Sequence, residues 1–583
     1  MKFRNLFLVI LLFLVFMNCT GDKSTVLKSL QLTSPWWVQM DSAASGLNQV
    51  WFAADFPLKN AAPLPVSALF EPVDGNVNWY FTEFEFSQPE KNTAQWGLRL
   101  TSIKDHASIW LNGEFVAEKK VWTACASYDV TSLLRNGLNR LTLCLTDKDQ
   151  LQRPFGAVDL FQYLFEEDLK KGKYFSSAIP AYPSWLEQAV FYEINLTHPP
   201  ELPEMIQLAN TLSELGAAAV CLPALMMSDS ITTLEPFADT SRYRQLNPQL
   251  GQRADFLKFV QTLHDSGLYA IADFDVTPFM NQNKVLSGKP TANPTSTEDV
   301  IDEAFSNSII QILKYWLNQT HIDGFRFLKA DLLPVSFWKK VRQELLKLKP
   351  VIIVGEADNP QFNATAFDVT YSKAKDEYIQ RILAGQYPLT ELTQIIRAQY
   401  YCFPRGSSVL HAFHDYGAKE IFSPATRTQL EKISTILAVT APGNPLILFP
   451  HQNFSGESAL PDSQKYFLQI LGSLYYQFAP LIKNGEFRQL NTNTDERVLV
   501  FERKSESGRI LVLLNLTDQE IDFNLETGGM QGFMQEIFRK IKLNLSGTRT
   551  RIRLKPWEHR IYINAQFRVL KRRSVYIPVD NPA

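Results

Sequence analysis

Cysteine is scarce in this chain, and net charge is almost absent. The 583 residues include 5 cysteines, with no CxxC or Cys/His spacing that would suggest a disulfide scaffold or a zinc site. The 58 basic and 60 acidic residues nearly cancel, which excludes a strongly basic nucleic-acid binder. A hydrophobic content of 45% excludes a disordered chain. The length is about four times a common domain of ~150 residues, so we expect several domains whose chemistry uses oxygen and nitrogen side chains.

The N-terminus carries an apolar run at residues 6–17, which is too short to span a hydrocarbon core of ~30 Å. Lys2 and Arg4 precede the run, and Cys19 and a polar stretch follow it. Residues 1–19 therefore resemble a bacterial lipoprotein signal peptide, which implies a cell-envelope protein anchored to a membrane, periplasmic or surface-exposed, by acylation of Cys19. The bulky residues before Cys19 leave cleavage elsewhere, or a retained anchor, as alternatives.

The remaining cysteines lie in apolar, strand-like runs. They are Cys125, Cys144, Cys221 and Cys402. Such surroundings favour buried thiols. A Cys125–Cys144 bridge is the alternative in an oxidising compartment.

Residues 36–165 alternate apolar and polar positions in short runs, a pattern typical of an antiparallel β-sandwich. The motifs in this region are Ile109-Trp-Leu-Asn-Gly, Tyr128-Asp-Val-Thr-Ser-Leu-Leu and Gly137-Leu-Asn-Arg-Leu. They resemble the jelly-roll sugar-binding domain of family 2 glycoside hydrolases. Candidate sugar-stacking side chains are Trp36, Trp37, Trp110 and Trp122. Tryptophans in strands are more often core residues, so we expect packing roles for them.

After a predicted linker at 166–184, short apolar runs alternate with longer amphipathic stretches, a pattern that indicates parallel βα units. The predicted strands are 189–194, 217–222, 269–274, 324–328, 351–356, 408–413 and 445–449. Their spacing predicts the α/β fold class, with a (β/α)8 TIM barrel at 185–480. An antiparallel β-domain at 481–566 and a basic tail at 567–583 are expected to follow.

Barrel active sites are built at the carboxyl ends of the strands. The polar residues at those positions are Asp273, Asp275, Arg326, Glu356, His414 and Asp415. They are therefore the candidate site residues.

An ordered set of motifs runs along the predicted barrel. The motifs are Phe191-Tyr-Glu-Ile, Leu222-Pro, Leu246-Asn-Pro, Ile271-Ala-Asp, Gly324-Phe-Arg, Val354-Gly-Glu and His414-Asp. In this order they resemble the α-amylase superfamily, glycoside hydrolase family 13, over residues 185–565. The resemblance implies an enzyme that hydrolyses O-glycosyl bonds of α-glucans by a retaining mechanism, which needs two carboxyl groups ~5–5.5 Å apart.

The same resemblance implies roles for individual residues. Glu356 matches the acid/base, Asp415 the aspartate that stabilises the transition state, and His414 a contact to a sugar hydroxyl. Arg326 matches the arginine that holds the nucleophile. The nucleophile belongs two residues after that arginine, where this sequence has Leu328. A hydrocarbon side chain cannot attack the anomeric carbon.

Other family residues are also replaced. Pro278 replaces a histidine of the family, and Phe413 replaces an amide residue. Ala238 and Arg242 lie where the family has a tyrosine and an aspartate. Thr277 replaces an asparagine that holds calcium in some members. We therefore expect no required metal and no cofactor.

Two other carboxylates are considered as substitutes for the nucleophile. Asp331 lies three residues beyond Leu328, ~10 Å along an extended strand, and is expected to be a helix N-cap or a surface residue. Asp275 shares a strand face with Asp273. We expect Asp275 to pair with Arg326 or Lys329, which would offset charge left by the missing aspartate.

Three functions remain open. The preferred one is an envelope lipoprotein that binds an α-glucan or oligosaccharide, with impaired or absent hydrolysis. The second is an active hydrolase or transglycosylase that uses Glu356 with Asp415 or Asp275, where an inverting route is conceivable. The third is a non-enzymatic scaffold for a membrane-protein partner. For Glu356 itself, a working acid and a former acid in a buried polar network both stay open.

Overall fold

The computed structural model describes residues 29–32, 35–64, 77–88, 95–103, 106–119, 123–146, 157–196, 199–226, 243–279, 303–412, 424–449 and 460–570. Several predicted features lie outside the described residues: the leader with Cys19, Trp122, Ala238, Arg242, Phe413, His414, Asp415 and residues 571–583. None of the described helices is long and apolar enough to cross a membrane.

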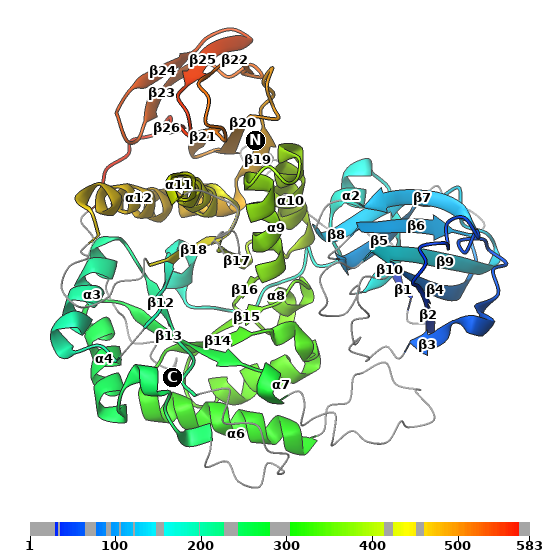
Figure 1. Ribbon diagram of the computed structural model, residues 1–583, viewed down its shortest axis with the longest axis horizontal. Coiled ribbons are helices and arrows are strands. Elements are labelled where there is room, and N and C mark those ends of the chain that lie inside the picture. Colours follow the sequence, from blue (N-terminus) through cyan, green and yellow to red (C-terminus); the bar gives the residue numbers. More distant parts are fainter. Residues whose placement is uncertain are drawn as a thin grey trace, which may run out of the picture.

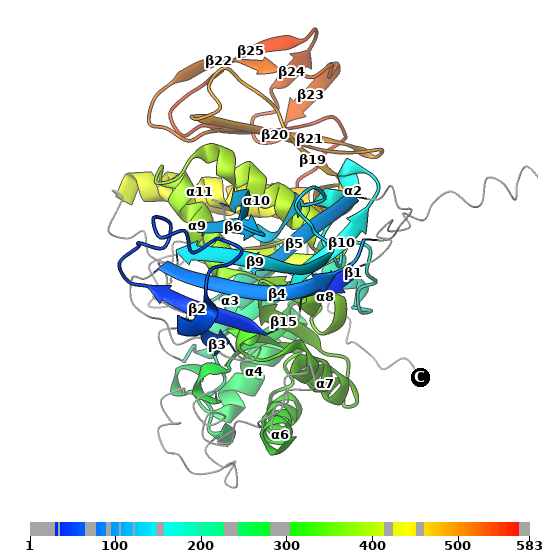
Figure 2. The same ribbon diagram turned by 90° about the vertical axis from the view of Figure 1, so that its right-hand side faces the viewer.

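Two antiparallel sheets form the N-terminal region (Figure 2). The smaller sheet has the order β1 (Ser29–Gln31), β10 (Val158–Tyr163), β5 (Gln95–Ile103) and β8 (Thr123–Asp129). The larger has the order β3 (Ala62–Leu64), β2 (Trp36–Asp41), β4 (Val77–Phe86), β9 (Gly137–Thr146), β6 (His106–Leu111) and β7 (Glu114–Lys119). Leu98 and Leu100 of one sheet pack with Leu141 and Leu143 of the other, so the pair is the predicted sandwich.

The tryptophans of the sandwich that the structure describes are packing residues. Trp36 is 6% exposed in the core between the sheets. Trp110 is 5% exposed and stacks on Trp79, with ring centroids 5.4 Å apart, in an aromatic cluster that Trp37 also contacts. The expected core role is therefore observed for Trp36 and Trp110.

The central region is a closed barrel of parallel strands (Figure 1). In order, these are β11 (Phe191–Glu193), β12 (Ala219–Leu222), β13 (Tyr269–Asp275), β14 (Gly324–Leu328), β15 (Ile352–Glu356), β16 (Val369–Tyr371), β17 (Ser408–His411) and β18 (Asn444–Leu448). All were predicted except β16. It is three residues long and lies between the polar residues Asp368 and Ser372, so no longer apolar run marks it, whereas the equally short β11 lies within the predicted run 189–194.

Helices surround the barrel. They are α3 (Leu202–Glu214), α4 (Arg253–Asp265), α6 (Glu303–Thr320), α7 (Val335–Leu346), α8 (Gln361–Thr365), α9 (Lys373–Leu383), α10 (Leu389–Cys402), α11 (Pro424–Thr440) and α12 (Asp462–Asn484). Short 3-10 turns accompany them: η1 (Leu58–Asn60), η2 (Ser184–Gln188), η5 (Pro248–Leu250) and η6 (Ala330–Leu332).

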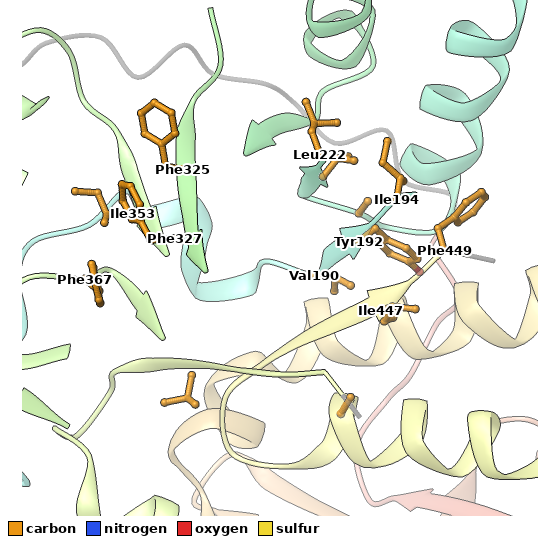
Figure 3. Close-up of a cluster of buried hydrophobic side chains, with 14 of the residues drawn as sticks. Val190, Tyr192, Ile194, Leu222, Phe325, Phe327, Ile353, Phe367, Ile447 and Phe449 are labelled. Atoms are coloured by element: carbon orange, nitrogen blue, oxygen red, sulfur yellow. The ribbon is translucent and has the colours of Figure 1, made fainter. Parts of the chain in front are cut away.

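Successive strand residues point alternately to the helices and to the barrel interior. Phe325, Phe327 and Ile353 belong to the large outer core under the helices (Figure 3). Ile352 and Val354 belong to a separate inner core. This alternation decides which side chains can reach the carboxyl end of the barrel interior.

An antiparallel β-domain follows α12, and Figure 1 shows it on the far side of α11 and α12 from the barrel strands. Its main sheet has the order β19 (Glu486–Gln489), β20 (Val498–Ser505), β21 (Gly508–Asn515), β26 (His559–Ile563), β23 (Gly532–Glu536) and β24 (Lys542–Leu545). A second sheet pairs β22 (Ile521–Glu526) with β25 (Arg549–Leu554). The region predicted to begin this domain at residue 481 is still the last turn of α12.

The Cys125–Cys144 bridge considered as an alternative is wrong. Cys125 of β8 is bonded to Cys402 of α10, while Cys144 and Cys221 are buried free thiols. Cys144 lies in the other sheet of the sandwich, opposite Trp79, whereas Cys125 faces the barrel helices. Only the packing of the sandwich against the barrel brings the bonded pair together.

The predicted linker lies along this contact. It contains helix α2 (Glu166–Lys170), and the Gly172 N–H donates to the Tyr401 carbonyl over 2.8 Å. A Cβ on Gly172 would stand 2.7 Å from the carbonyl oxygen of Cys402, so the two backbones approach as closely as glycine permits.

Candidate active site at the carboxyl ends of the barrel strands

The strand register brings several predicted site residues to one end of the barrel interior. Asp273 pairs with Arg326 across β13 and β14, and Glu356 pairs with Tyr371 across β15 and β16. On each strand, these side chains lie two residues from a side chain that faces the barrel interior. They therefore also face the interior, at the carboxyl end of the barrel.

Arg326 is the centre of a buried ion cluster. Its Nε and Nη2 donate to the two oxygens of Asp273, each over 2.7 Å, and its Nη1 donates to Glu193 Oε2 over 2.6 Å. Burial alone would lower the pKa of Arg326, but the charges of Asp273 and Glu193 outweigh it and raise that pKa well above the usual value. The guanidinium is therefore held by Asp273 of the neighbouring strand β13 and by Glu193 of β11, without a carboxylate from its own strand.

Asp275 was expected to pair with Arg326 or Lys329, and neither ion pair is found among the described residues. The register sets Asp273 opposite Arg326, while Asp275 lies one layer higher, opposite Leu328. Asp275 Oδ1 instead accepts the backbone N–H of Thr277 over 2.8 Å. Since Asp273 and Glu193 already occupy the guanidinium, no charge is left there for Asp275 to offset.

Leu328 is half-buried and packs against the inner core of the barrel. It lies two residues after Arg326, on the same strand face. The position that the family resemblance assigns to the nucleophile therefore holds a hydrocarbon side chain directed into the barrel.

Glu356 is fixed by the turn that follows β14. Its Oε2 accepts the Lys329 N–H over 2.9 Å and the Tyr371 hydroxyl over 3.4 Å. Burial raises the pKa of the Glu356 carboxyl, the Lys329 N–H lowers it, and the charges of Asp331 and Asp358 raise it further. These surroundings favour a carboxyl group that holds its proton, as a general acid requires.

Asp331 does not have its expected place. Lys329 adopts a left-handed backbone with φ of 52°, so the chain turns immediately after Leu328 and Asp331 lies inside η6, whose N-cap is Lys329. The N-cap prediction is wrong for this reason. The turn also brings the Asp331 charge within electrostatic range of Glu356.

The chain is similar to several known proteins. Residues 487–561 match the family model described as maltogenic amylase, C-terminal domain. A cyclomaltodextrinase from Bacillus sp is 21% identical over 418 residues, which cover 57% of this chain and 73% of that protein. A maltogenic α-amylase from Bacillus acidopullulyticus is 21% identical over 411 residues, 60% of this chain and 68% of that protein.

A solved structure shares the fold. The noncanonic maltogenic α-amylase AmyB from Thermotoga neapolitana aligns with a TM-score of 0.52 and 20% identity, over 66% of this chain and all of that one. The chain has an α-amylase-like barrel fold.

Two residues at this end of the barrel were missed by the sequence analysis. Glu193 is part of the motif at the first strand, and its position at the carboxyl end of that strand could have marked it as a site residue. Tyr371 lies on β16, the strand that the sequence pattern did not reveal. Tyr371 reaches Glu356 from the adjacent strand. Glu193 on β11 reaches Arg326 on β14, a strand that is not its neighbour, across the barrel interior.

No metal-binding cluster of three or more His, Cys, Asp or Glu side chains occurs among the residues that the structure describes. The predictions for His414, Asp415 and Cys19 stay predictions, because these residues lie outside the described ranges.

Proposed function

We propose that the protein binds α-glucans at the carboxyl end of its amylase-family barrel and lacks the family's retaining hydrolysis. Leu328 carries this proposal. Loss of a catalytic nucleophile costs on the order of 10⁶ in turnover, or ~8 kcal/mol of barrier. Asp273 and Glu193 hold Arg326 in its inward orientation without that nucleophile.

The substrate class rests on the relatives. The matching C-terminal family model is named for maltogenic amylase, and the two similar proteins are named cyclomaltodextrinase and maltogenic α-amylase. Malto-oligosaccharides are therefore the ligands that we propose. The lipid anchor on Cys19 and the envelope location remain part of the proposal, supported by the leader pattern.

Calorimetric titration with maltoheptaose tests the binding. We expect a dissociation constant of ~1 mM or tighter, about 4 kcal/mol of binding free energy. Absence of binding at millimolar maltoheptaose would remove the proposal.

A mechanism-based probe tests the missing nucleophile separately. An activated fluorinated glucosyl fluoride traps the glycosyl-enzyme intermediate of retaining enzymes as a covalent adduct. We expect the intact mass of this protein to remain unchanged after incubation. A mass increase of one glycosyl unit, mapped to an acidic side chain, would contradict the loss of the retaining route.

A further inference from the structure

Three inward positions form one row across neighbouring barrel strands. Asp275 on β13 pairs with Leu328 on β14. Phe327 pairs with Gly355 one residue earlier, so Leu328 is followed in the same row by Glu356 on β15. Two carboxyl groups therefore flank the hydrocarbon side chain of Leu328.

The side chains of this row point toward the barrel interior. Tyr269 and Ile271 of β13 belong to the inner core, and Asp275 has the same parity on that strand. Ile352 and Val354 of β15 also belong to the inner core, and Glu356 has the same parity on that strand. Both carboxyl groups thus face the same space at the carboxyl end of the barrel.

The spacing of the row distinguishes two chemistries. Neighbouring strands lie ~4.8 Å apart, so a carboxylate at position 328 would stand one strand from Glu356, close to the ~5–5.5 Å of retaining enzymes. Asp275 stands two strands away, roughly 10 Å between α-carbons before side chains converge. That separation approaches the ~6.5–9.5 Å of inverting enzymes, which leave room for a water molecule.

The environments of the two carboxyl groups suit different tasks. Arg326 is engaged by Asp273 and Glu193, so it does not neutralise Asp275. Asp275 Oδ1 is oriented by the Thr277 N–H, and within the described part of the chain Oδ2 has no hydrogen-bond partner. Glu356 is half-buried and held by the Lys329 N–H, in surroundings that favour its protonated form.

We propose that Asp275 and Glu356 are the base and acid of an inverting glycoside hydrolysis, with the catalytic carboxylate moved by one strand from its family position. This inference rests on the proposed α-glucan ligand. Asp275 takes a proton from a water molecule while the oxygen of that water bonds to the anomeric carbon. Glu356 gives its proton to the departing glycosidic oxygen as that bond breaks, so the sum is one water consumed per link.

A purely structural role for Asp275 makes a different prediction. As a cap for the turn after β13 it needs only an oxygen that accepts the Thr277 N–H, and the amide of Asp275→Asn supplies one. The substitution would then leave turnover unchanged. As a base it needs the carboxylate, and turnover would fall ~100- to 10,000-fold.

The experiment follows maltoheptaose hydrolysis by proton NMR in the first minutes, before the product anomers equilibrate. We expect newly formed reducing ends in the β configuration, inverted from the α-linked substrate. Asp275→Asn and Glu356→Gln should each lose turnover while maltoheptaose affinity stays within about twofold. Asp265→Asn, on the exposed end of α4, is the matched control and should keep the wild-type rate.

The outcomes separate this inference from the proposed function. Product in the α configuration, or an Asp275→Asn variant as fast as wild type, would overturn the assignment of Asp275. Maltoheptaose binding without hydrolysis above the rate of the Glu356→Gln protein would overturn the acid/base pair and leave the binding proposal standing. Absence of binding would remove both.

Discussion

Asp273 and Glu193 hold a buried arginine on a strand that carries Leu328, and no acidic residue, two positions further on. Both carboxylates come from other strands, and the guanidinium stays in an inward position with charge-assisted bonds on three of its nitrogens. Sequence spacing identified Arg326 and Asp273 as site residues. It could not assign their pairing, because the register of β13 and β14 decides whether Asp273 or Asp275 lies opposite Arg326.

Asp273→Asn tests this ion cluster. The substitution leaves a buried guanidinium short of one charge, so we expect a loss of about 3–5 kcal/mol in unfolding free energy. Urea unfolding followed by tryptophan fluorescence measures it. Asp275→Asn is the control: its amide still accepts the Thr277 N–H, and we expect a change within ~0.5 kcal/mol. Equal losses would contradict the pairing described here.

Glu356 predicts a pH dependence of stability. Burial raises its pKa in the folded protein above the ordinary 4.5, so ionising it opposes folding. The penalty is absent below pH 4.5, where the side chain is protonated in both states, and grows as the pH rises. Glu356→Gln should therefore melt higher than wild type at pH 7 and equal to it near pH 4, measured by scanning calorimetry.

Glu344 on α7 serves as the control of opposite sign. Its hydrogen bonds with Lys314 and Lys347 lower its pKa to about 2, so its contribution is present above pH 4.5 and lost as the pH falls. Glu344→Gln should lower the melting temperature at pH 7 and have less effect near pH 3. The same sign for both variants would be inconsistent with these assignments.

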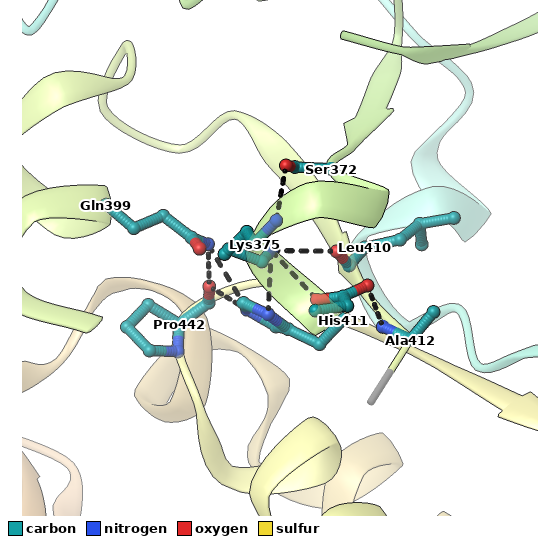
Figure 4. Close-up of polar contacts among 8 residues, drawn as sticks. Ser372, Lys375, Gln399, Leu410, His411, Ala412 and Pro442 are labelled. Carbon is teal, nitrogen blue, oxygen red and sulfur yellow. Dashed lines mark hydrogen bonds and ion pairs between the residues drawn. The ribbon is translucent and has the colours of Figure 1, made fainter. Parts of the chain in front are cut away.

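At the scale of elements, α9 is tied to the end of β17 by buried polar contacts (Figure 4). Lys375 Nζ lies 3.5 Å from Asp376 Oδ1 and 3.4 Å from His411 Nδ1. The Ala412 N–H donates to Asp376 Oδ2 over 3.1 Å. The network fixes the end of β17 at His411, and the predicted site residues His414 and Asp415 follow three and four residues later in the sequence.

Lys375→Met tests this connection. Burial already raises the pKa of Asp376 to about 6, against the Lys375 charge that lowers it. Without that cation the pKa rises further, so the cost of the ionised carboxylate grows across and above pH 6. We expect a loss of about 3–5 kcal/mol at pH 7 and a smaller loss at pH 4, from urea unfolding at both values.

Lys258→Met on α4 is the control. Lys258 is exposed, so its removal should change unfolding free energy by less than ~0.5 kcal/mol. If Lys375→Met were equally harmless, the network would not be holding the strand end.

The sequence pattern predicted some of the barrel strands and missed one. β13, β14 and β15 were predicted because each combines an apolar run with a polar residue at its carboxyl end. β16 was not predicted because its three residues lie between polar Asp368 and Ser372, without a longer apolar run. Tyr371, which contacts Glu356, was lost with it.

At the scale of the molecule, the Cys125–Cys402 disulfide fastens the sandwich to the barrel. It joins residues separated by 277 positions, and the two cysteines are 6% and 2% exposed. The bond closes a loop that contains most of the barrel, so it forms only after β8 and α10 have met. Such a bond also needs an oxidising compartment, which supports the proposal of export.

Cys402→Ala tests this fastening. We expect a stability loss of about 2–5 kcal/mol, observed in calorimetry as a lower melting temperature or a separate transition for the sandwich. In the wild type, a non-reducing tryptic map should contain peptide 121–135 joined to peptide 398–405. Cys144→Ala, in the aromatic cluster of the sandwich, should leave that joined peptide intact. Separate alkylated peptides from oxidised wild-type protein would contradict the bond.

The sequence by itself determined the order of domains, the barrel and the residue types at its strand ends, because alternation and spacing are local properties of a chain. Leu328 in place of an acidic residue is such a local fact. Only the tertiary structure decided that Arg326 faces Asp273 and Glu193, that Asp275 and Glu356 flank Leu328, and that Cys125 meets Cys402. Those contacts depend on strand register, barrel closure and domain packing, which join residues tens to hundreds of positions apart.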